Sequence, residues 1–206
     1  MNIYDHCRLS VRKFGGVVDD YYGIHKFMDS SKLFYFNPRH RLLLHNLYGI
    51  EMTIKRFGDY IVNSENIVIL VRDIAAEHCK EDLSGRVPSL SDWLKDNEEE
   101  IAPMITLPKF ENKILEEFVL FPKFKSNCHS ALLITLSNFG VYLANEILGF
   151  EYGKELQTLL NQKATVQNYL SKYKFTKRWQ FTPAPKESEW LKMNSSQTET
   201  SLKLEK

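Results

Sequence analysis

The stretch from Asn37 to Gly58, NPRHRLLLHNLYGIEMTIKRFG, decides the fold class of this chain. Asn37 is a good helix N-cap, Pro38 suits the first helical position, and Gly58 is a typical helix stop. The apolar residues between them recur at helical spacing and form one stripe, made of Leu43, Leu47, Ile50, Ile54 and Phe57. We therefore predict one continuous helix over residues 38–57 at the centre of a mainly α-helical protein.

The same periodicity, with glycine and proline as boundaries, predicts further helices on both sides. They are expected over residues 3–13, 21–34, 73–83, 89–94, 111–120, 127–148 and 153–173. One β-hairpin is expected from Tyr60–Val62 and Ile67–Arg72, because two β-branched apolar runs flank the polar tetrapeptide Asn63–Asn66. The predicted fold is a helical bundle with one small β-hairpin and a disordered C-terminal tail.

A change in composition near residue 100 suggests two parts. An acidic run followed by two prolines marks residues 95–110 as a connector. We expect an N-terminal helical domain over residues 1–100 and a C-terminal helical subdomain packed on it over residues 101–182. Residues 183–206 contain mostly Lys, Glu, Ser and Thr, which predicts a disordered tail.

The two parts share a faint internal similarity. Tyr48-Gly49-Ile50 is followed by Phe57-Gly58, and Phe139-Gly140-Val141 is followed by Leu148-Gly149 at the same interval. A duplicated helical hairpin and a coincidence between two apolar helices that each end in glycine are both consistent with this pattern.

Composition excludes several classes of protein. The 206 residues carry a net charge of +1, which argues against nucleic acid as a partner. The longest apolar run, Ile67–Val71, is far too short to span a membrane. Three widely spaced cysteines suggest free, buried thiols in a reducing compartment, so we expect a cytoplasmic protein. A protein partner or a homo-oligomer stays open.

The segment Tyr173–Phe181, YKFTKRWQF, interleaves basic and aromatic residues. This pattern suits stacking on single-stranded nucleic acid. We favour the simpler interpretation, in which Phe175, Trp179 and Phe181 lie on the core.

Histidines are concentrated at the N-terminal end of the chain. Five of the six lie in the first 80 residues: His6, His25, His40, His45 and His78. His25 is followed by Asp29 and His78 by Asp82, each four positions on, so each pair shares one helix face. Helical bundles build metal sites from such pairs, and imidazole with carboxylate suits zinc, iron or manganese.

We therefore predict a divalent transition-metal site, with ligands drawn from His25, Asp29, His40, His78 and Asp82. His40 and His45 would lie about 140° apart on a straight helix and cannot easily bind one ion together. His45 could serve a second ion, a substrate or only a hydrogen bond, and we assign it to substrate together with Arg39, Arg41 and Arg72. Buried hydrogen-bonded histidines without a metal, or scattered surface histidines, are the alternatives.

Several short strings resemble a family of small phage and bacterial proteins, a domain of unknown function, over residues 3–95. The strings include SVRKFGG (residues 10–16), IHKFMDSSK (24–32), RHR (39–41), Glu77-His78 and Glu81-Asp82-Leu83. The chain departs from the family's pattern at Ser84-Gly85, which is one residue longer. The resemblance implies a phage or bacterial origin and a cytoplasmic setting, in the host if the protein is phage-encoded. The family pattern includes the His and Asp positions given above.

Two functions follow as hypotheses. The first is a metal-dependent hydrolase of a phosphoester or nucleotide, in which the ion generates the nucleophile from bound water. No catalytic residue is assigned beyond the metal ligands. The alternative is a non-enzymatic viral accessory or structural protein that binds a host or virion protein.

Overall fold

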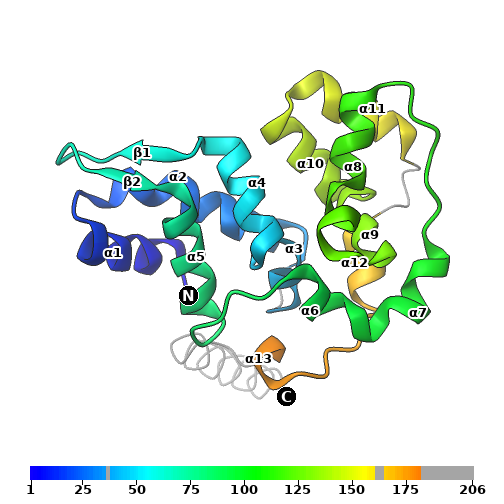
Figure 1. Ribbon diagram of the computed structural model, residues 1–206, viewed down its shortest axis with the longest axis horizontal. Coiled ribbons are helices and arrows are strands. Elements are labelled where there is room, and N and C mark those ends of the chain that lie inside the picture. The colour runs from blue at the N-terminus through cyan, green and yellow to red at the C-terminus, as the bar shows by residue number, and fades with distance from the viewer. Residues whose placement is uncertain (36–37, 161–164, 182–206) are drawn as a thin grey trace, which may run out of the picture.

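The computed structural model of this protein describes residues 1–35, 38–160 and 165–181. These residues form a helical protein with one two-stranded antiparallel hairpin (Figure 1). The prediction of a mainly α-helical fold with one small hairpin is therefore confirmed. Asn37 and the predicted tail over residues 183–206 lie outside the described residues.

The N-terminal half contains four helices of 11 to 12 residues, the hairpin and several short turns. Its elements are α1 (Ile3–Phe14), α2 (Val18–Asp29), η1 (Ser30–Leu33), η2 (Pro38–His40), α3 (Arg41–Leu44), α4 (Leu47–Phe57), β1 (Tyr60–Val62), β2 (Val68–Leu70), α5 (Val71–Asp82) and α6 (Leu90–Leu94). The hairpin pairs Tyr60 with Leu70 and Val62 with Val68. The predicted strand to Arg72 was too long, because Val71 already opens α5.

The C-terminal half contains α8 with 14 residues, α10 and α11 with 10 residues each, and several shorter helices. Its elements are η3 (Lys95–Asn97), α7 (Glu98–Ile101), η4 (Ala102–Met104), α8 (Lys113–Ser126), η5 (His129–Ala131), α9 (Leu132–Thr135), α10 (Asn138–Ile147), α11 (Phe150–Leu159), α12 (Val166–Leu170) and α13 (Arg178–Phe181). The expected connector over residues 95–110 is thus helical in its first part. The single helices expected over residues 127–148 and 153–173 are each interrupted.

The prediction of one continuous helix over residues 38–57 was wrong. The chain leaves helical geometry at His45 and Asn46, and α4 begins anew at Leu47. The Asn46 side chain accepts a hydrogen bond from the Gly49 amide, which makes Asn46 an N-cap. Gly49 permits the break, since a Cβ atom there would lie 1.8 Å from the Leu44 carbonyl oxygen. The N-cap at Asn46 and the close contact at Gly49 therefore break the continuous helix that the apolar stripe predicted.

The same break recurs in the second half of the chain. Three consecutive elements of the first half have equivalents that begin 91 residues later. The element η2 begins at Pro38 and η5 at His129, α3 begins at Arg41 and α9 at Leu132, and α4 begins at Leu47 and α10 at Asn138. Ser137 caps α10 as Asn46 caps α4, and a Cβ atom at Gly140 would lie 1.9 Å from the Thr135 oxygen. This agreement favours a duplicated structural unit over coincidence.

The apolar core connects the two halves. Its largest cluster contains Leu42, Leu43 and Leu44 of α3 together with α9 and α10 residues such as Leu132 and Phe139. Two smaller clusters lie among α1, α2, α4 and α5. In Figure 1 these four helices and the hairpin form one group, beside the group that contains α8 to α12. Buried polar side chains of α1, α2 and α5 lie among these same helices.

The cysteines and the aromatic residues near the C-terminal end of the described chain also lie in the core. Cys7, Cys79 and Cys128 are free and buried, as predicted. Phe175 is buried, and Trp179 packs on the core with its ring 4.7 Å from that of Trp93, centroid to centroid. The side chain of Phe181 is outside the described part. Within the described ranges no helix combines the length and apolar character needed to cross a lipid bilayer.

Candidate metal centre

Six polar side chains that favour metal ions meet inside the N-terminal half. They are His6 of α1, His25 and Asp29 of α2, His45 of the break before α4, and His78 and Asp82 of α5. Each residue is at most 3% exposed. Burying this many imidazoles and carboxylates is costly unless they satisfy one another or hold a cation.

Local helix geometry explains how two of these elements present their ligands. His78 and Asp82 are four residues apart on α5 and share its buried face with Ile74 and Ala75. His25 and Asp29 are likewise both buried on α2. The helical spacing of each pair therefore delivers two polar groups to the same interior space.

Four donor atoms from three elements surround one point. The His45 Nε2 atom lies 3.1 Å from His78 Nε2, 3.3 Å from Asp82 Oδ2 and 3.7 Å from Asp29 Oδ1. The distance from His78 Nε2 to Asp29 Oδ1 is 3.6 Å. With ion–ligand bonds of about 2.1 Å, neighbouring ligand atoms would lie about 3.0–3.4 Å apart in octahedral or tetrahedral geometry. The observed spacings thus fit a single ion with little adjustment.

The hydrogen bonding of these atoms also favours a cation. Among the residues that the structure describes, the buried Oδ1 atom of Asp29 has no hydrogen-bond partner. The Nε2 atoms of His45 and His78 face each other, and each can accept a hydrogen bond. At most one proton can therefore lie between these two atoms. Orphaned buried acceptors are rare in folded proteins and often indicate an ion or water that completes them. A divalent ion at this point would satisfy all four atoms.

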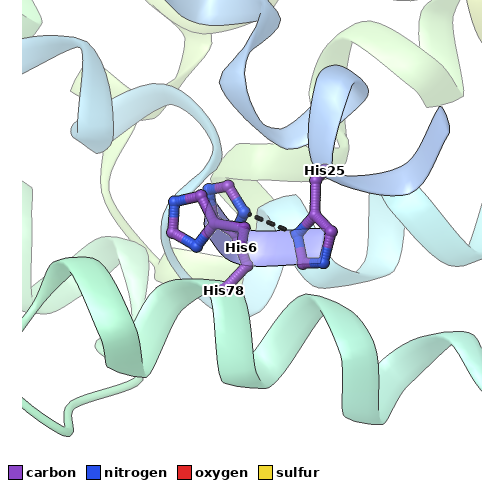
Figure 2. Close-up of side chains that lie close together, drawn as sticks. All are labelled: His6, His25 and His78. Atoms are coloured by element: carbon purple, nitrogen blue, oxygen red, sulfur yellow. Dashed lines mark hydrogen bonds between the residues drawn. The ribbon is translucent and has the colours of Figure 1, made fainter. Parts of the chain in front are cut away.

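A hydrogen-bonded chain runs away from His78 on its other side. His78 Nδ1 lies 2.9 Å from His25 Nδ1, and His25 Nε2 lies 2.9 Å from the Ser10 hydroxyl (Figure 2 shows the His25–His78 contact). If His78 Nε2 binds an ion, its proton must be on Nδ1, which donates to His25. His25 Nε2–H then donates to Ser10. Such outer partners orient metal-bound imidazoles and fix their tautomer.

Charge and burial set the protonation states. Burial lowers the pKa of His25 to about 3 and that of His45 to about 4. Burial alone would raise the pKa of Asp82, but the His45 hydrogen bond and the Arg41 charge hold it well below its usual value. Neutral imidazole and ionised carboxylate are the forms that bind metals.

Cations border both carboxylates. The Lys32 ammonium lies 2.8 Å from Asp29 Oδ2, and the Arg41 guanidinium lies 3.3 Å from Asp82 Oδ2. The Met1 nitrogen lies 2.8 Å from Asp82 Oδ1. Arg41 is fully buried. The two aspartates are therefore balanced in part by basic groups, and a divalent ion would leave the filled centre positively charged.

His6 forms the outer edge of the cluster. Its Nδ1 atom makes a hydrogen bond with Glu81, and its ring stacks on that of His78 at 3.9 Å between centroids (Figure 2). Burial, followed by the charge of Asp82, raises the pKa of Glu81 to about 7. His6 Nε2 lies 3.5 Å from Asp82 Oδ1.

The sequence of this half matches a known domain family. Residues 1–102 match the family model of DUF6915, a domain of unknown function. The DUF6915 region contains all six cluster residues, and the resemblance expected over residues 3–95 is confirmed by this match. No curated protein and no solved structure matches the chain.

Within the DUF6915 region, the structure gathers some of the predicted site residues and separates others. Asp29, His78 and Asp82 share the four-atom set, and His25 is one hydrogen bond away. His40 lies beside the set, with its Nδ1 atom 2.9 Å from the Ser31 hydroxyl. Its ring is 5.1 Å from that of His45, centroid to centroid, because the broken helix removes the 140° separation.

The arginines expected to hold substrate do not lie together. Arg41 contacts Asp82 inside the cluster. The Arg39 guanidinium lies over the Phe175 ring. Arg72 is exposed in the first turn of α5, about 15 Å along the helix from Asp82 at a rise of 1.5 Å per residue. Among these three, Arg41 is thus the arginine that contacts a cluster carboxylate.

Sequence reasoning assigned His45 to substrate and omitted His6 from the ligands. The signal for His45 was the pair Asn46 and Gly49, an N-cap followed by a glycine, which predicts a helix start after His45. The signal for His6 was its spacing of four residues from Ser10, which places both on the buried face of α1. Both signals are local, yet their meaning depends on which helices pack together.

Proposed function

We propose that the DUF6915 region binds a divalent transition-metal ion through Asp29, His45, His78 and Asp82. The observation that carries this proposal is a set of four buried donor atoms of which four of the six separations are 3.1–3.7 Å. One of these atoms is a carboxylate oxygen without a hydrogen bond in the described structure. Two imidazoles and two carboxylates suit zinc, manganese or ferrous iron. The Cys79 thiol is not part of the set.

Metal content and stability test this proposal directly. Protein stripped with a chelator is dialysed against Zn²⁺ or Mn²⁺, and bound metal is measured by elemental analysis. An ion at about 100 times its dissociation constant adds about 2.7 kcal/mol to the free energy of unfolding. At this chain length that corresponds to a rise in Tm of about 5–10 °C. A wild-type protein that binds no metal and shows no shift refutes the proposal.

Variants locate the ion. His45→Ala and Asp82→Asn are expected to abolish tight binding, because each removes one of four ligands. His129→Ala is the matched control, since His129 lies on η5 in the second half and is not one of the six cluster residues. Unchanged metal binding in His45→Ala would place the ion elsewhere.

We further propose that the bound ion activates a water molecule for hydrolysis of a phosphoester. An ion of this kind lowers the pKa of bound water to about 7 and so supplies hydroxide at neutral pH. The buried Arg41 guanidinium beside Asp82 supports an anionic substrate, because it adds positive charge next to the ion. The ligand side chains are at most 2% exposed, which favours a small substrate.

Turnover of bis(p-nitrophenyl) phosphate by metal-loaded protein tests the hydrolytic part. Activity that depends on added metal and disappears in His45→Ala supports it. Stoichiometric metal with no turnover of this or other small phosphoesters would instead favour the alternative, a non-enzymatic accessory protein whose ion stabilises the fold.

A further inference from the structure

His6 carries a buried donor atom that the four-atom set does not use. Its ring is fully buried on α1, and its Nδ1 atom is held by the hydrogen bond to Glu81. In the described part of the chain, the opposite atom, Nε2, has no hydrogen-bond partner. A carboxylate that holds one imidazole nitrogen and leaves the other as the ligand atom is the arrangement that orients metal-binding histidines.

His6 Nε2 lies close to the second oxygen of Asp82. Asp82 Oδ2 faces His45 at 3.3 Å, inside the four-atom set. Asp82 Oδ1 faces the other way, 3.5 Å from His6 Nε2. That distance is close to the spacing of about 3.0–3.4 Å expected for two ligands of one ion. The carboxylate of Asp82 therefore borders two positions, one at each oxygen.

His78 is a poor candidate to share an ion with His6. The two rings stack at 3.9 Å with an angle of 24° between their planes. Imidazole lone pairs lie in the ring plane, so those of stacked rings run nearly parallel and do not converge. His78 also directs its two nitrogens at His25 and His45. The position beside His6 is thus separate from the first ion and is joined to it through Asp82.

We propose that a second divalent ion binds between His6 Nε2 and Asp82 Oδ1, with Asp82 bridging two ions. This inference rests on the proposed function, because it needs the first ion at Asp82 Oδ2. The second ion has two protein ligands, so its remaining positions are open to water or substrate oxygen. Bridged pairs of this kind hold the oxygens of phosphoesters in hydrolytic enzymes.

Partly exposed side chains border the cluster both at His6 and at Asp29. Glu81 and Met1, beside His6, are 16% and 14% exposed, and Lys32, beside Asp29, is 32% exposed, whereas the ligand side chains themselves are at most 2% exposed. On the His6 side, the Met1 ammonium makes an ion pair of 2.8 Å with Asp82 Oδ1, so the second ion must displace it. A phosphate oxygen that reaches the second ion from this side would displace water and meet the positive charge of the centre.

The stoichiometry of metal binding tests the proposal on full-length protein. Chelator-stripped wild type is titrated with Mn²⁺ and Zn²⁺, and bound metal is counted at saturation. We expect two ions per chain, the second bound more weakly because it has fewer protein ligands. Two Mn²⁺ ions bridged by Asp82 should also give the spin-coupled electron paramagnetic resonance spectrum of a pair.

The His6→Ala variant should bind one ion with the affinity of the first site, and the His129→Ala control should bind two. Inorganic phosphate should bind to the two-ion wild type and more weakly to His6→Ala. One ion in the wild type, or two ions in His6→Ala, overturns the second site while leaving the first intact. No ion in the wild type refutes the proposed function itself. The wild-type count decides even if His6→Ala does not fold.

Discussion

The two equivalent helix breaks allow the fold to be separated from the site. A Cβ atom at Gly49 would lie 1.8 Å from the Leu44 carbonyl oxygen, and one at Gly140 would lie 1.9 Å from that of Thr135. Carbon and oxygen atoms at van der Waals contact are more than 1 Å farther apart, so each Gly→Ala change must open the break. Overpacking of this kind costs about 1–3 kcal/mol, and occasionally more.

We predict that Gly49→Ala and Gly140→Ala lower the free energy of unfolding by similar amounts, and that only Gly49→Ala lowers the metal affinity. Gly49→Ala displaces the break that carries His45, whose Nε2 atom is 3.1 Å from His78 Nε2. A ligand moved by 1 Å cannot keep bonds of about 2.1 Å, so the metal affinity falls. In the second break, the position equivalent to His45 is Leu136, which is not a metal ligand. Gly140→Ala should therefore lower the free energy of unfolding and leave the metal affinity unchanged.

Urea unfolding of metal-free protein and metal titration measure the two effects. Gly58→Ala is the control for backbone cost alone, because Gly58 has φ +87° and a Cβ atom added there would meet no other atom within 4 Å. It should cost about 1–2 kcal/mol and leave metal binding unchanged. Equal metal affinity in Gly49→Ala and Gly140→Ala would refute the assignment of His45 as a ligand.

Three other changes probe the cluster. The folded pKa values of His25 and His45, about 3 and about 4, lie below the unfolded value of about 6.5, so stability is present above pH 6.5 and lost as the pH falls toward 4. The free energy of unfolding of metal-free protein, measured by urea titration, should therefore drop between pH 7.5 and pH 5 by about 2 kcal/mol for each ring; a constant value contradicts this. His25→Ala removes the partner of His78 and should weaken metal binding about 10–100-fold, measured by competition with a chelating dye, whereas an unchanged affinity would show that His25 does not orient the ligand. Arg41→Leu, which copies Leu132 of the second unit, leaves the buried Asp82 without its guanidinium and should cost about 3–5 kcal/mol without metal. The decrease in the free energy of unfolding should be smaller with metal bound than without it, and urea titrations of both forms measure the two values.

The candidate site was only partly predictable from local pattern. The spacing of His78 and Asp82 identified their common buried face, because residues four apart always share a side of a helix. The pairing of His45 with them was not predicted, because the apolar stripe from Leu43 to Phe57 indicated a straight helix. Asn46 and Gly49 contradicted the stripe, and the contact between Gly49 and Leu44 decided the outcome.

The structural repeat was also only partly predictable from the sequence. Two short glycine strings were consistent with a duplication and with coincidence alike, and the equivalent breaks at Asn46 and Ser137 were visible only in the structure. The second unit carries Ala131, Leu132 and Leu136 where the first carries His40, Arg41 and His45. The shared backbone is therefore compatible with a polar centre in one copy and an apolar core in the other.

The amino-acid sequence by itself determined the helical class, the hairpin, the free thiols and the pairs of His and Asp on α2 and α5. These features depend on neighbours within one or two turns of the chain. Only the tertiary structure decided that α1, α2, α5 and the break before α4 converge on one point. That convergence depends on the packing of helices distant in sequence, which places His6 beside Asp82 across 75 residues and more of intervening chain.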